Sequence, residues 1–508
     1  MKVIRITLSC LILFFSFWGN TQTKTAEYLA IINELNLQDM RHAMSSVGSH
    51  GLNPLGYWTT AMETAYQTGQ NSVGGVFLRD MANQNYLRLL KDISIGTVDP
   101  VTMGKDVRLL RKEFLTPAQL RTLALAQAYK AWPLLEQLAP LHAPYISLKE
   151  SLQKISAFCA NNAWPVLPAL KAELKMGTKN PQVTAIKTRL QQFGYKVTVD
   201  DTFDAATLAA VKDIQWLMRK TPDGVISPGG RTWLYLNKSC QDRLRQVRLD
   251  MEKLRWFPQV FEERFIFVNL AMSYFNMIDR VTPGAKTMSF RTINGRISRP
   301  SPMLKDKVVQ VILNPFWVVP PTIFREDKVE DIRKLAPWEI DYYFDSHNYE
   351  VWNKDFTRRI SPSSIDWQRL DAKHDADFYI RQKPHTGNAL GIFKFMLTNS
   401  FAIYLHDTNQ RELFAEPDRL ISSGCVRVER PLDLAEYLLR GTQWTREVIE
   451  RTVAKPGEVL NKDTPINLKQ PVPVYMAFLT SHYDASGIIR FTEDSYGQDK
   501  RLIEKGVW

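Results

Sequence analysis

Two short stretches decide the fold and the chemistry of this chain: Tyr404-Leu405-His406-Asp407-Thr408 and Ser422-Ser423-Gly424-Cys425-Val426-Arg427-Val428. The first predicts a strand that delivers His406, and the second predicts a turn of small residues that delivers Cys425. A surface loop between them can bring the two side chains together. A cysteine in so polar a turn favours a reactive thiol, with a structural cysteine as the alternative.

This pair of side chains suits attack on an acyl carbon. A thiolate is a strong nucleophile but a minor species at the free thiol pKa of about 8.5, and a neighbouring histidine can accept the proton. The same histidine, His406, can later take a proton from an incoming amine. Gly424 lets the backbone come close, so that amide groups at Cys425 and its neighbours can face a developing oxyanion.

Length and composition describe a folded protein of several domains. The chain has 508 residues, of which 44% are hydrophobic and 23% are charged. At roughly 100–200 residues per domain this length implies about three domains, and the composition excludes a mainly disordered chain or a disulfide-dense miniprotein. The formal net charge of +12 favours an anionic partner, namely nucleic acid, an acidic membrane or an acidic cell-wall polymer.

The first residues predict export. Lys2 and Arg5 precede an apolar run at 6–18 and a polar stretch, so residues 1–21 are typical of a secretory signal. The run is shorter than the about 20 residues of a membrane-spanning helix, with an uncleaved anchor or a buried helix as alternatives. In an exported, periplasmic chain, nucleic acid is a poor partner and an envelope polymer a better one. We expect the membrane to be reached only through this segment.

The four cysteines bear on the compartment and on metal binding. Cys10 lies in the expected signal, which leaves Cys159, Cys240 and Cys425. An odd number in an exported chain indicates a free thiol, and whether Cys159 and Cys240 pair stays open. The sequence has no CxxC and no HExxH motif, so we expect no metal and no cofactor.

Changes of periodicity predict a multidomain α+β protein. The expected parts are the signal at 1–21, a helical scaffold domain at 22–175, a small module at 176–238, a scaffold helix or linker at 239–260, and a β-rich domain at 261–508. The Arg and Lys residues of the scaffold helix are expected to form a solvated basic face. Strands stop between 327 and 383, where charged and aromatic residues increase, so we expect a helical insertion that caps the β-rich domain as a lid.

The module at 176–238 resembles the small three-helix peptidoglycan-binding domain. The matching features are Val183-x-x-Ile186, Leu190-Gln191, Gly194-Tyr195, Phe203-Asp204-x-x-Thr207, Val211-Lys212-x-x-Gln215 and Asp223-Gly224-x-Ile226. Their order is more specific than any single piece, and a generic helical segment is the alternative. The resemblance implies that the module binds peptidoglycan and does no chemistry itself.

The two stretches quoted first resemble the signature of the L,D-transpeptidase catalytic domain, the YkuD-type fold. The signature is a histidine, a loop, and then Ser or Thr two residues before Gly-Cys. This resemblance implies that Cys425 is the nucleophile, that His406 is the base, and that the backbone carbonyl of Asp407 orients the imidazole. The whole chain is most similar to the large periplasmic branch, which has a helical scaffold, a peptidoglycan-binding module and a capping insertion.

The chain departs from the commonest family pattern at two positions. Ser423 stands where many members have histidine, and Arg427 stands where many have asparagine. Together with Tyr404, these are the candidate substrate-binding residues. The guanidinium of Arg427 can pair with a substrate carboxylate, with an exposed surface arginine as the alternative.

The resemblance implies a two-step acyl transfer in cell-wall biogenesis or remodelling and in cell shape. The cysteine attacks the bond between the third residue of a tetrapeptide stem and D-Ala, and the side-chain amine of a neighbouring stem converts the thioester into a 3→3 cross-link. Attack by water makes an L,D-carboxypeptidase, and attack by a lipoprotein lysine makes a protein-anchoring enzyme. The family also implies acylation by carbapenems. The rival of a different class is a catalytically inactive wall-binding scaffold.

Overall fold

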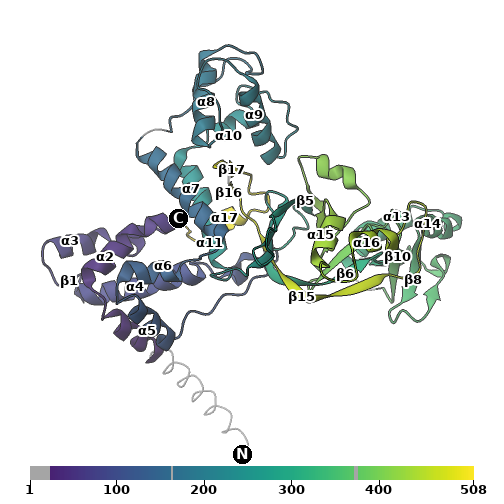
Figure 1. Cartoon of the computed structure of the whole chain (residues 1–508), viewed down its shortest axis with the longest axis horizontal. Coiled ribbons are helices and arrows are strands. Elements are labelled where there is room, and N and C mark those ends of the chain that lie inside the picture. The colour runs from purple at the N-terminus through teal and green to yellow at the C-terminus, as the bar shows by residue number, and fades with distance from the viewer. Residues whose placement is uncertain (1–22, 162–163, 371–375, 485, 508) are drawn as a thin grey trace, which may run out of the picture. The chain divides into compact units, whose positions relative to one another are not determined.

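The computed structural model describes residues 23–161, 164–370, 376–484 and 486–507 (Figure 1). The chain divides into two compact units. Unit 1 comprises residues up to 217 together with 222–261 and 478–508, and unit 2 comprises 218–221 and 262–477. The expected signal at 1–21, with Cys10, lies outside the described residues. The helical first part and the β-rich later part confirm the predicted multidomain α+β class.

Helices make up the N-terminal part of unit 1, as predicted. They are α2 (Leu37–Ser46), η1 (Val47–His50), η2 (Pro54–Gly56), α3 (Thr60–Gln67), α4 (Leu78–Ile95), η3 (Pro100–Met103), α5 (Pro117–Ala126), α6 (Ala131–Leu138) and α7 (Ala143–Ala160), with a hairpin of β1 (Ser72–Val73) and β2 (Val76–Phe77). Local sequence fixes their ends. Thr116 and Gln119, for example, form a capping box at the start of α5. Ile32, Leu89 and Leu135 are fully buried, as expected for helices that share a core.

A three-helix module continues unit 1 and has the helices that the sequence predicted. Its helices are α8 (Pro181–Gln192), α9 (Ala205–Leu217) and α10 (Arg231–Leu236) (Figure 1). The fully buried Lys187 of α8 pairs with Asp200 at 2.8 Å and with Asp204 at 2.9 Å. These ion pairs tie α8 to the turn that leads into α9.

The helix α11 (Cys240–Arg255) contradicts the expected solvated basic face. Lys253 and Arg255 are buried, with exposed fractions of 0% and 1%. Lys253 pairs with Asp250 at 2.8 Å, and Arg255 pairs with Glu252 at 2.8 Å. Lysine and arginine are almost never fully buried unless they are paired, and here the partner lies three residues earlier on the same helix. The spacing of the basic residues alone did not reveal these partners.

The C-terminal segment packs within unit 1, which differs from the expected extent of the β-rich domain, 261–508. It contains β16 (Ser481–Tyr483), β17 (Ile489–Phe491) and α17 (Gln498–Glu504). Asp499 of α17 forms a second ion pair with the buried Lys253, and the Thr480 hydroxyl donates to Asp499 at 2.8 Å. These buried polar contacts bind the end of the chain to α11.

Cys159 and Cys240, whose pairing the sequence left open, form a disulfide with their Cα atoms 5.8 Å apart. The bond joins the C-terminal turn of α7 to the first residue of α11. Among the described residues, Cys425 is therefore the free cysteine.

Unit 2 is built on a nine-stranded mixed sheet. The strand order is β13-β5-β14-β12-β11-β6-β15-β3-β4, and β4 also pairs with β5, so that the sheet closes on itself. The strands are β3 (Arg264–Asn269), β4 (Tyr274–Asp279), β5 (Met288–Gly295), β6 (Leu304–Leu313), β11 (Phe393–Leu397), β12 (Leu405–His406), β13 (Leu420–Ser422), β14 (Val426–Val428) and β15 (Thr464–Ala477). The other elements of this part are η7 (Arg411–Ala415), α15 (Pro431–Leu438) and α16 (Arg446–Thr452).

The insertion between β6 and β11 forms a cap that is not purely helical, contrary to the expectation for 327–383. Its elements are β7 (Trp317–Val318), α12 (Pro321–Ile323), η4 (Phe324–Lys328), α13 (Val329–Arg333), η5 (Pro337–Glu339), α14 (Ile340–Ser346), β8 (Tyr349–Asn353), β9 (Arg359–Ile360), η6 (Pro362–Ser364) and β10 (Phe378–Gln382). The strands form a separate sheet in the order β7-β10-β8-β9. Each strand has five residues or fewer, and the two longer ones, β8 and β10, mix aromatic with charged side chains. Periodicity therefore did not distinguish them from their helical neighbours.

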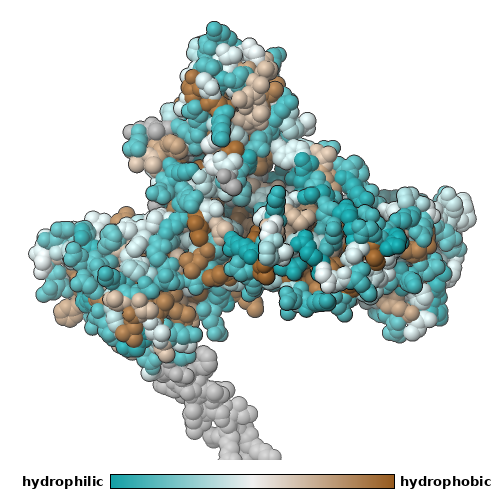
Figure 2. Space-filling model, viewed as in Figure 1, coloured by the Kyte–Doolittle hydropathy of each residue, from teal (hydrophilic) through white to brown (hydrophobic). Residues whose placement is uncertain are grey.

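The surface visible in Figure 2 is mainly hydrophilic, with hydrophobic side chains scattered among polar ones. Two aromatic side chains of the cap, Trp338 and Tyr342, are among the exposed exceptions. Within the described part of the chain, no helix is long and apolar enough to cross a bilayer.

Candidate active site

Three neighbouring strands bring the candidate catalytic residues to one face of the sheet in unit 2. His406 on β12 lies opposite Lys394 of β11 on one side and opposite Arg427 of β14 on the other. Opposed residues on neighbouring strands point to the same face, and side chains two positions apart along a strand share that face. Tyr404 and Cys425, each two positions earlier, therefore belong to this face as well. The alternate positions Leu405 and Val426 are fully buried on the other face.

The turn before β14 has a backbone shape that requires glycine. Gly424 has a φ of 115°, a conformation that L side chains rarely adopt. The buried Ser422 holds the turn: its hydroxyl donates to the Cys425 carbonyl at 2.7 Å and accepts from the Gly424 amide at 3.2 Å. The Ser301 hydroxyl donates to the Gly424 carbonyl at 2.7 Å. Since the Gly424 amide is engaged, the Cys425 amide is the better candidate for an oxyanion contact.

A cavity of about 460 Å³ opens over this face. Its lining includes the predicted residues Tyr404, His406, Ser423, Gly424, Cys425 and Arg427. The backbone of Asp407 follows His406, but Asp407 does not line the cavity. The opposite wall comes from the cap, including Trp317, Thr322 and Ile323. The cavity therefore lies between the sheet and the cap within a single compact unit.

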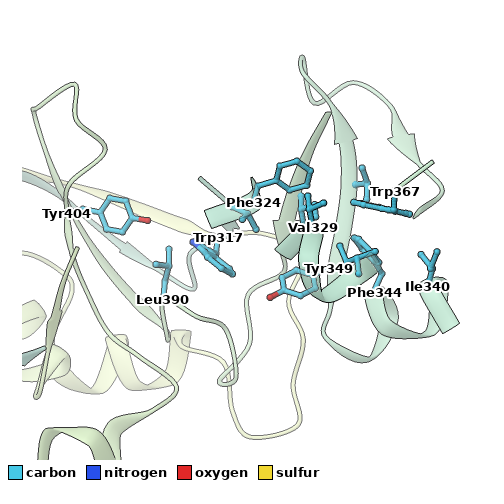
Figure 3. Packing of buried hydrophobic residues seen from close by; sticks show 13 residues of the cluster. Trp317, Phe324, Val329, Ile340, Phe344, Tyr349, Trp367, Leu390 and Tyr404 are labelled. Carbon is cyan, nitrogen blue, oxygen red and sulfur yellow. The ribbon is translucent and has the colours of Figure 1, made fainter. Parts of the chain in front are cut away.

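The cap and the sheet share one hydrophobic cluster beside the cavity. Figure 3 shows Tyr404 and Leu390 of the sheet side, with Trp317 next to them and the cap residues Phe324 and Tyr349 beyond. Cys425 is partly buried against the same cluster. Closing the cavity with apolar side chains excludes water from the space in front of the thiol.

The Cys425 thiol is neutral at rest. Burial raises its pKa, while the backbone and hydroxyl of Tyr404 and the positive charges of Lys394 and Arg427 oppose that shift. The thiol donates to the backbone carbonyl of Ala402 at 3.5 Å. This contact stabilises the protonated form, so the nucleophile needs a base or a nearby cation to ionise.

His406 is neutral as well. Burial, together with the charges of Arg427 and Lys394, lowers the pKa of its imidazole to about 3, and the Asp407 backbone opposes the shift. The imidazole interacts with the Asp407 backbone, although Nδ1 makes no hydrogen bond of good geometry with any described residue. A neutral imidazole can accept a proton, which suits a general base.

The side chain of Asp407 supports the site without lining the cavity. It accepts from the Ile392 amide at 3.0 Å and forms an ion pair with Arg411 at 2.7 Å. Gly391 allows this approach, because a Cβ atom there would lie 2.3 Å from the Asp407 carboxylate. Asp407 thus fixes the loop before β11 against β12.

The two remaining candidate substrate residues have different partners: neutral side chains for Arg427 and a guanidinium for Ser423. Arg427 donates to Thr408 at 3.3 Å and to Gln410 at 3.0 Å, and its buried Nε has no hydrogen-bond partner among the described residues. The Ser423 hydroxyl accepts from Arg299 at 3.2 Å. A guanidinium without a carboxylate partner beside the cavity can receive a carboxylate from a substrate.

Sequence reasoning did not assign roles to three residues of the site: Lys394, Ser422 and Arg299. Lys394 is a lone charged residue between Phe393 and Phe395, and a lone charge in an apolar strand is a usable signal. Ser422 occupies the Ser or Thr position of the family signature and bonds within its own turn, so its signal is local. The role of Arg299 depends on a contact between segments distant in sequence, which no local pattern reveals.

Comparison with protein families assigns three parts of the chain. Residues 263–450 match the L,D-transpeptidase catalytic domain (YkuD), and residues 28–152 match a scaffold domain. Residues 179–234 match a family described as "Putative peptidoglycan binding domain".

Individual proteins are also similar to parts of this chain. A Haemophilus influenzae protein named "Putative L,D-transpeptidase" is 32% identical over 271 residues, which are 53% of this chain and 51% of that protein. The chain thus spans about half the length of this relative. Solved structures of an L,D-transpeptidase from Xylanimonas cellulosilytica and of L,D-transpeptidase 3 from Mycobacterium tuberculosis are each 12% identical. They cover 61% and 42% of this chain and 100% and 60% of their own, with TM-scores of 0.19 and 0.18.

The assignment rests on the sequence matches, and the motif around the free thiol lies inside the matched range. The chain carries an L,D-transpeptidase catalytic domain of the YkuD type together with a peptidoglycan-binding domain.

Proposed function

We propose that the protein is a peptidoglycan L,D-transpeptidase that forms 3→3 cross-links between tetrapeptide stems through a thioester on Cys425. The observation that carries this proposal is the arrangement of Tyr404, His406, Cys425 and Arg427 on one face of the sheet, all lining a cavity of about 460 Å³. The cavity is lined by the free thiol of Cys425, the neutral imidazole of His406 and the guanidinium of Arg427, which has no carboxylate partner among the described residues.

The first step forms the acyl-enzyme. His406 takes the thiol proton, and the sulfur attacks the carbonyl carbon of the third stem residue. The Cys425 amide supports the oxyanion. The C–N bond to D-Ala then breaks, the imidazolium returns the proton to the leaving amine, and a thioester remains. Arg427 can hold a stem carboxylate during this step.

The second step transfers the acyl group to an amine. His406 takes a proton from the side-chain amine of a neighbouring stem, and the amine attacks the thioester. The C–S bond breaks, the sulfur takes the proton, and a new amide joins the two stems. Attack by water gives an L,D-carboxypeptidase, and attack by a lipoprotein lysine gives an anchoring enzyme.

The cap supports transfer to an amine over hydrolysis. It contributes one wall of the cavity and an apolar cluster that reaches Tyr404 and Cys425. Excluding water slows hydrolysis of a thioester, while a stem bound in the cavity still presents its amine.

We further propose export to the periplasm. The disulfide between Cys159 and Cys240 supports this, since such bonds persist in oxidising compartments. The peptidoglycan-binding domain supports the cell wall as the place of action. Reaction with carbapenems at Cys425 is part of the same proposal.

The test is incubation with purified tetrapeptide-rich wall fragments, followed by mass analysis of the products. Dimers with 3→3 links and released D-Ala support the proposal. Tripeptides without dimers identify a carboxypeptidase. A Cys425→Ala protein that is folded and still makes dimers would refute the role of the thiol, and no product from the intact protein would favour a wall-binding scaffold.

A further inference from the structure

We propose that Lys394 is a positioning residue that prepares Cys425 for ionisation. Its ammonium lies over the ring of Tyr404 and stabilises the thiolate, a role that a charged imidazole would otherwise have. The inference deepens the proposed function and rests on it for the role of the thiolate as nucleophile.

The backbone register places Lys394 at the site. On β11 it lies directly opposite His406 of β12, which in turn lies opposite Arg427 of β14. The three residues form a row across the sheet, and Cys425 lies two positions before Arg427. The Nζ atom of Lys394 is 4.1 Å from the centre of the Tyr404 ring, within the range of a cation–π contact.

Lys394 acts through Tyr404. Tyr404 lines the cavity, whereas Lys394 is not among the lining residues. The Tyr404 hydroxyl interacts with the Cys425 sulfur and favours its charged form. A cation on the ring of Tyr404 makes its O–H a stronger donor, and it also attracts the sulfur charge directly.

Among the described residues, no carboxylate lies within ion-pair distance of the Lys394 ammonium, and Asp463 acts on it only at longer range. Asp407 is already paired with Arg411. Asp327, the acidic residue in the cavity lining, is paired with Arg299 at 2.8 Å.

A half-buried lysine without a partner is costly, because burial disfavours its charged form. An anion that forms at the site offsets this cost. The Cys425 thiolate is the anion that this face can generate, since Tyr404 and Cys425 are its acidic groups and burial raises the pKa of Tyr404 well above its usual value.

The imidazole cannot supply this positive charge at rest. Burial holds the pKa of His406 at about 3, and the neighbouring cations Arg427 and Lys394 further disfavour an imidazolium. A fixed cation that stabilises the thiolate favours transfer of the thiol proton to His406. Once His406 has returned that proton to the leaving amine, it is neutral again and can accept a proton from the incoming amine. Lys394 therefore stabilises the charge of the thiolate, while His406 transfers the protons.

The experiment measures the rate at which iodoacetamide alkylates Cys425 as a function of pH, read from the mass of the peptide that carries this residue. The full-length protein is compared with Lys394→Met, Lys394→Arg and the control Lys307→Met. Lys307 is exposed on β6, so its variant removes the same charge from the same sheet outside the site. Circular dichroism checks that each variant is folded.

We expect the Lys394→Met profile to move upward by about one pH unit, which makes alkylation about tenfold slower at neutral pH. Lys394→Arg should keep the profile close to that of the unaltered protein, and Lys307→Met should leave it unchanged. Alkylation needs no peptidoglycan, so this result stands apart from failure of the proposed cross-linking activity.

Two outcomes would overturn the inference. An unchanged alkylation profile in Lys394→Met, with a raised KM for stem peptides, would make Lys394 a contact for a substrate carboxylate. A Lys394→Arg variant as slow as Lys394→Met would mean that packing on the Tyr404 ring matters and the charge does not.

Discussion

At the scale of single residues, Cys425 and His406 are both neutral at rest because burial disfavours the charged form of each side chain. In this protonation state the Cys425 thiol carries a proton, and the neutral imidazole of His406 can accept it. Acylation therefore does not need a prior ionisation that depends on the pH of the solution. In the proposed mechanism the ionisation happens inside the cavity, where Lys394 and Arg427 favour the thiolate.

The first prediction concerns pH. We expect kcat/KM for D-Ala release to stay nearly flat from about pH 5 to 8, because a histidine whose pKa lies at about 3 is not protonated in that range. Stopped assays on a soluble tetrapeptide across this range provide the measurement. An acid limb with its midpoint near the ordinary histidine pKa of about 6.5 would mean that His406 is exposed to solvent in the working enzyme.

The sequence identified Cys425 and His406, because a thiol in a small-residue turn and a histidine at a strand end are local patterns. It did not identify Lys394 as part of the site, although the residue is conspicuous in its strand. Its position depends on the register between β11 and β12, which no local pattern encodes. Likewise, the carboxylates that neutralise the buried basic residues of α11 became visible only with the fold.

At the scale of elements, the side chain of Arg299 ties the cap to the active-site turn. Arg299, in the loop between β5 and β6, binds Glu326 at 3.0 Å and Asp327 at 2.8 Å in the cap. The same guanidinium donates to Ser423 at 3.2 Å, two residues before Cys425. Arg299 thus connects the position of the cap to the position of Cys425.

The second prediction tests this connection with a Glu326→Gln/Asp327→Asn double variant. Without the two carboxylates the cap should open more often and admit water, which raises the ratio of tripeptide to 3→3 dimer severalfold while acylation continues. The control is Glu330→Gln, which removes a charge from the cap at a residue paired with Arg333 away from the turn. Equal product ratios in the double variant and the control would show that Arg299 does not restrain the cap.

The packing of the cap against the sheet limits which variants of the cap can be tested. Its small sheet and its aromatic core share a cluster with Tyr404 and Leu390. Excising the cap would expose this cluster, so substitutions at Glu326 and Asp327 are the sharper experiment. The sequence located the insertion but not its sheet, because β8 and β10 are short and are paired through residues far apart in the chain.

At the scale of the whole molecule, the chain returns to its first compact unit after building the second. The last segment is held there by Asp499, which shares the buried Lys253 with Asp250. Burial and the neighbouring Asp499 raise the pKa of Asp250 to about 6, and Lys253 opposes this shift. Lys253 therefore offsets the negative charge of the two buried carboxylates, Asp250 and Asp499, which would otherwise destabilise the fold.

The third prediction is that Lys253→Met destabilises unit 1 by about 3–5 kcal/mol at neutral pH, since removing one partner leaves buried charge uncompensated. The folded-state carboxylate pKa then lies further above its unfolded value, so the loss is largest above that pKa and shrinks as the pH falls. Urea unfolding at pH 7 and pH 5 provides the measurement, with the exposed Lys171→Met as control. A loss that is the same at both pH values would contradict the role assigned to Lys253.

The central claim is that the free thiol of Cys425 carries the acyl group in an L,D-transpeptidase reaction. The most direct measurement is peptide mass analysis of the protein after rapid quenching during turnover of a tetrapeptide stem. We expect an added mass equal to the tripeptide acyl group on the peptide that contains Cys425, with one D-Ala released for each group bound. Steady formation of product with no acyl group on Cys425, or with the group on another residue, would contradict it.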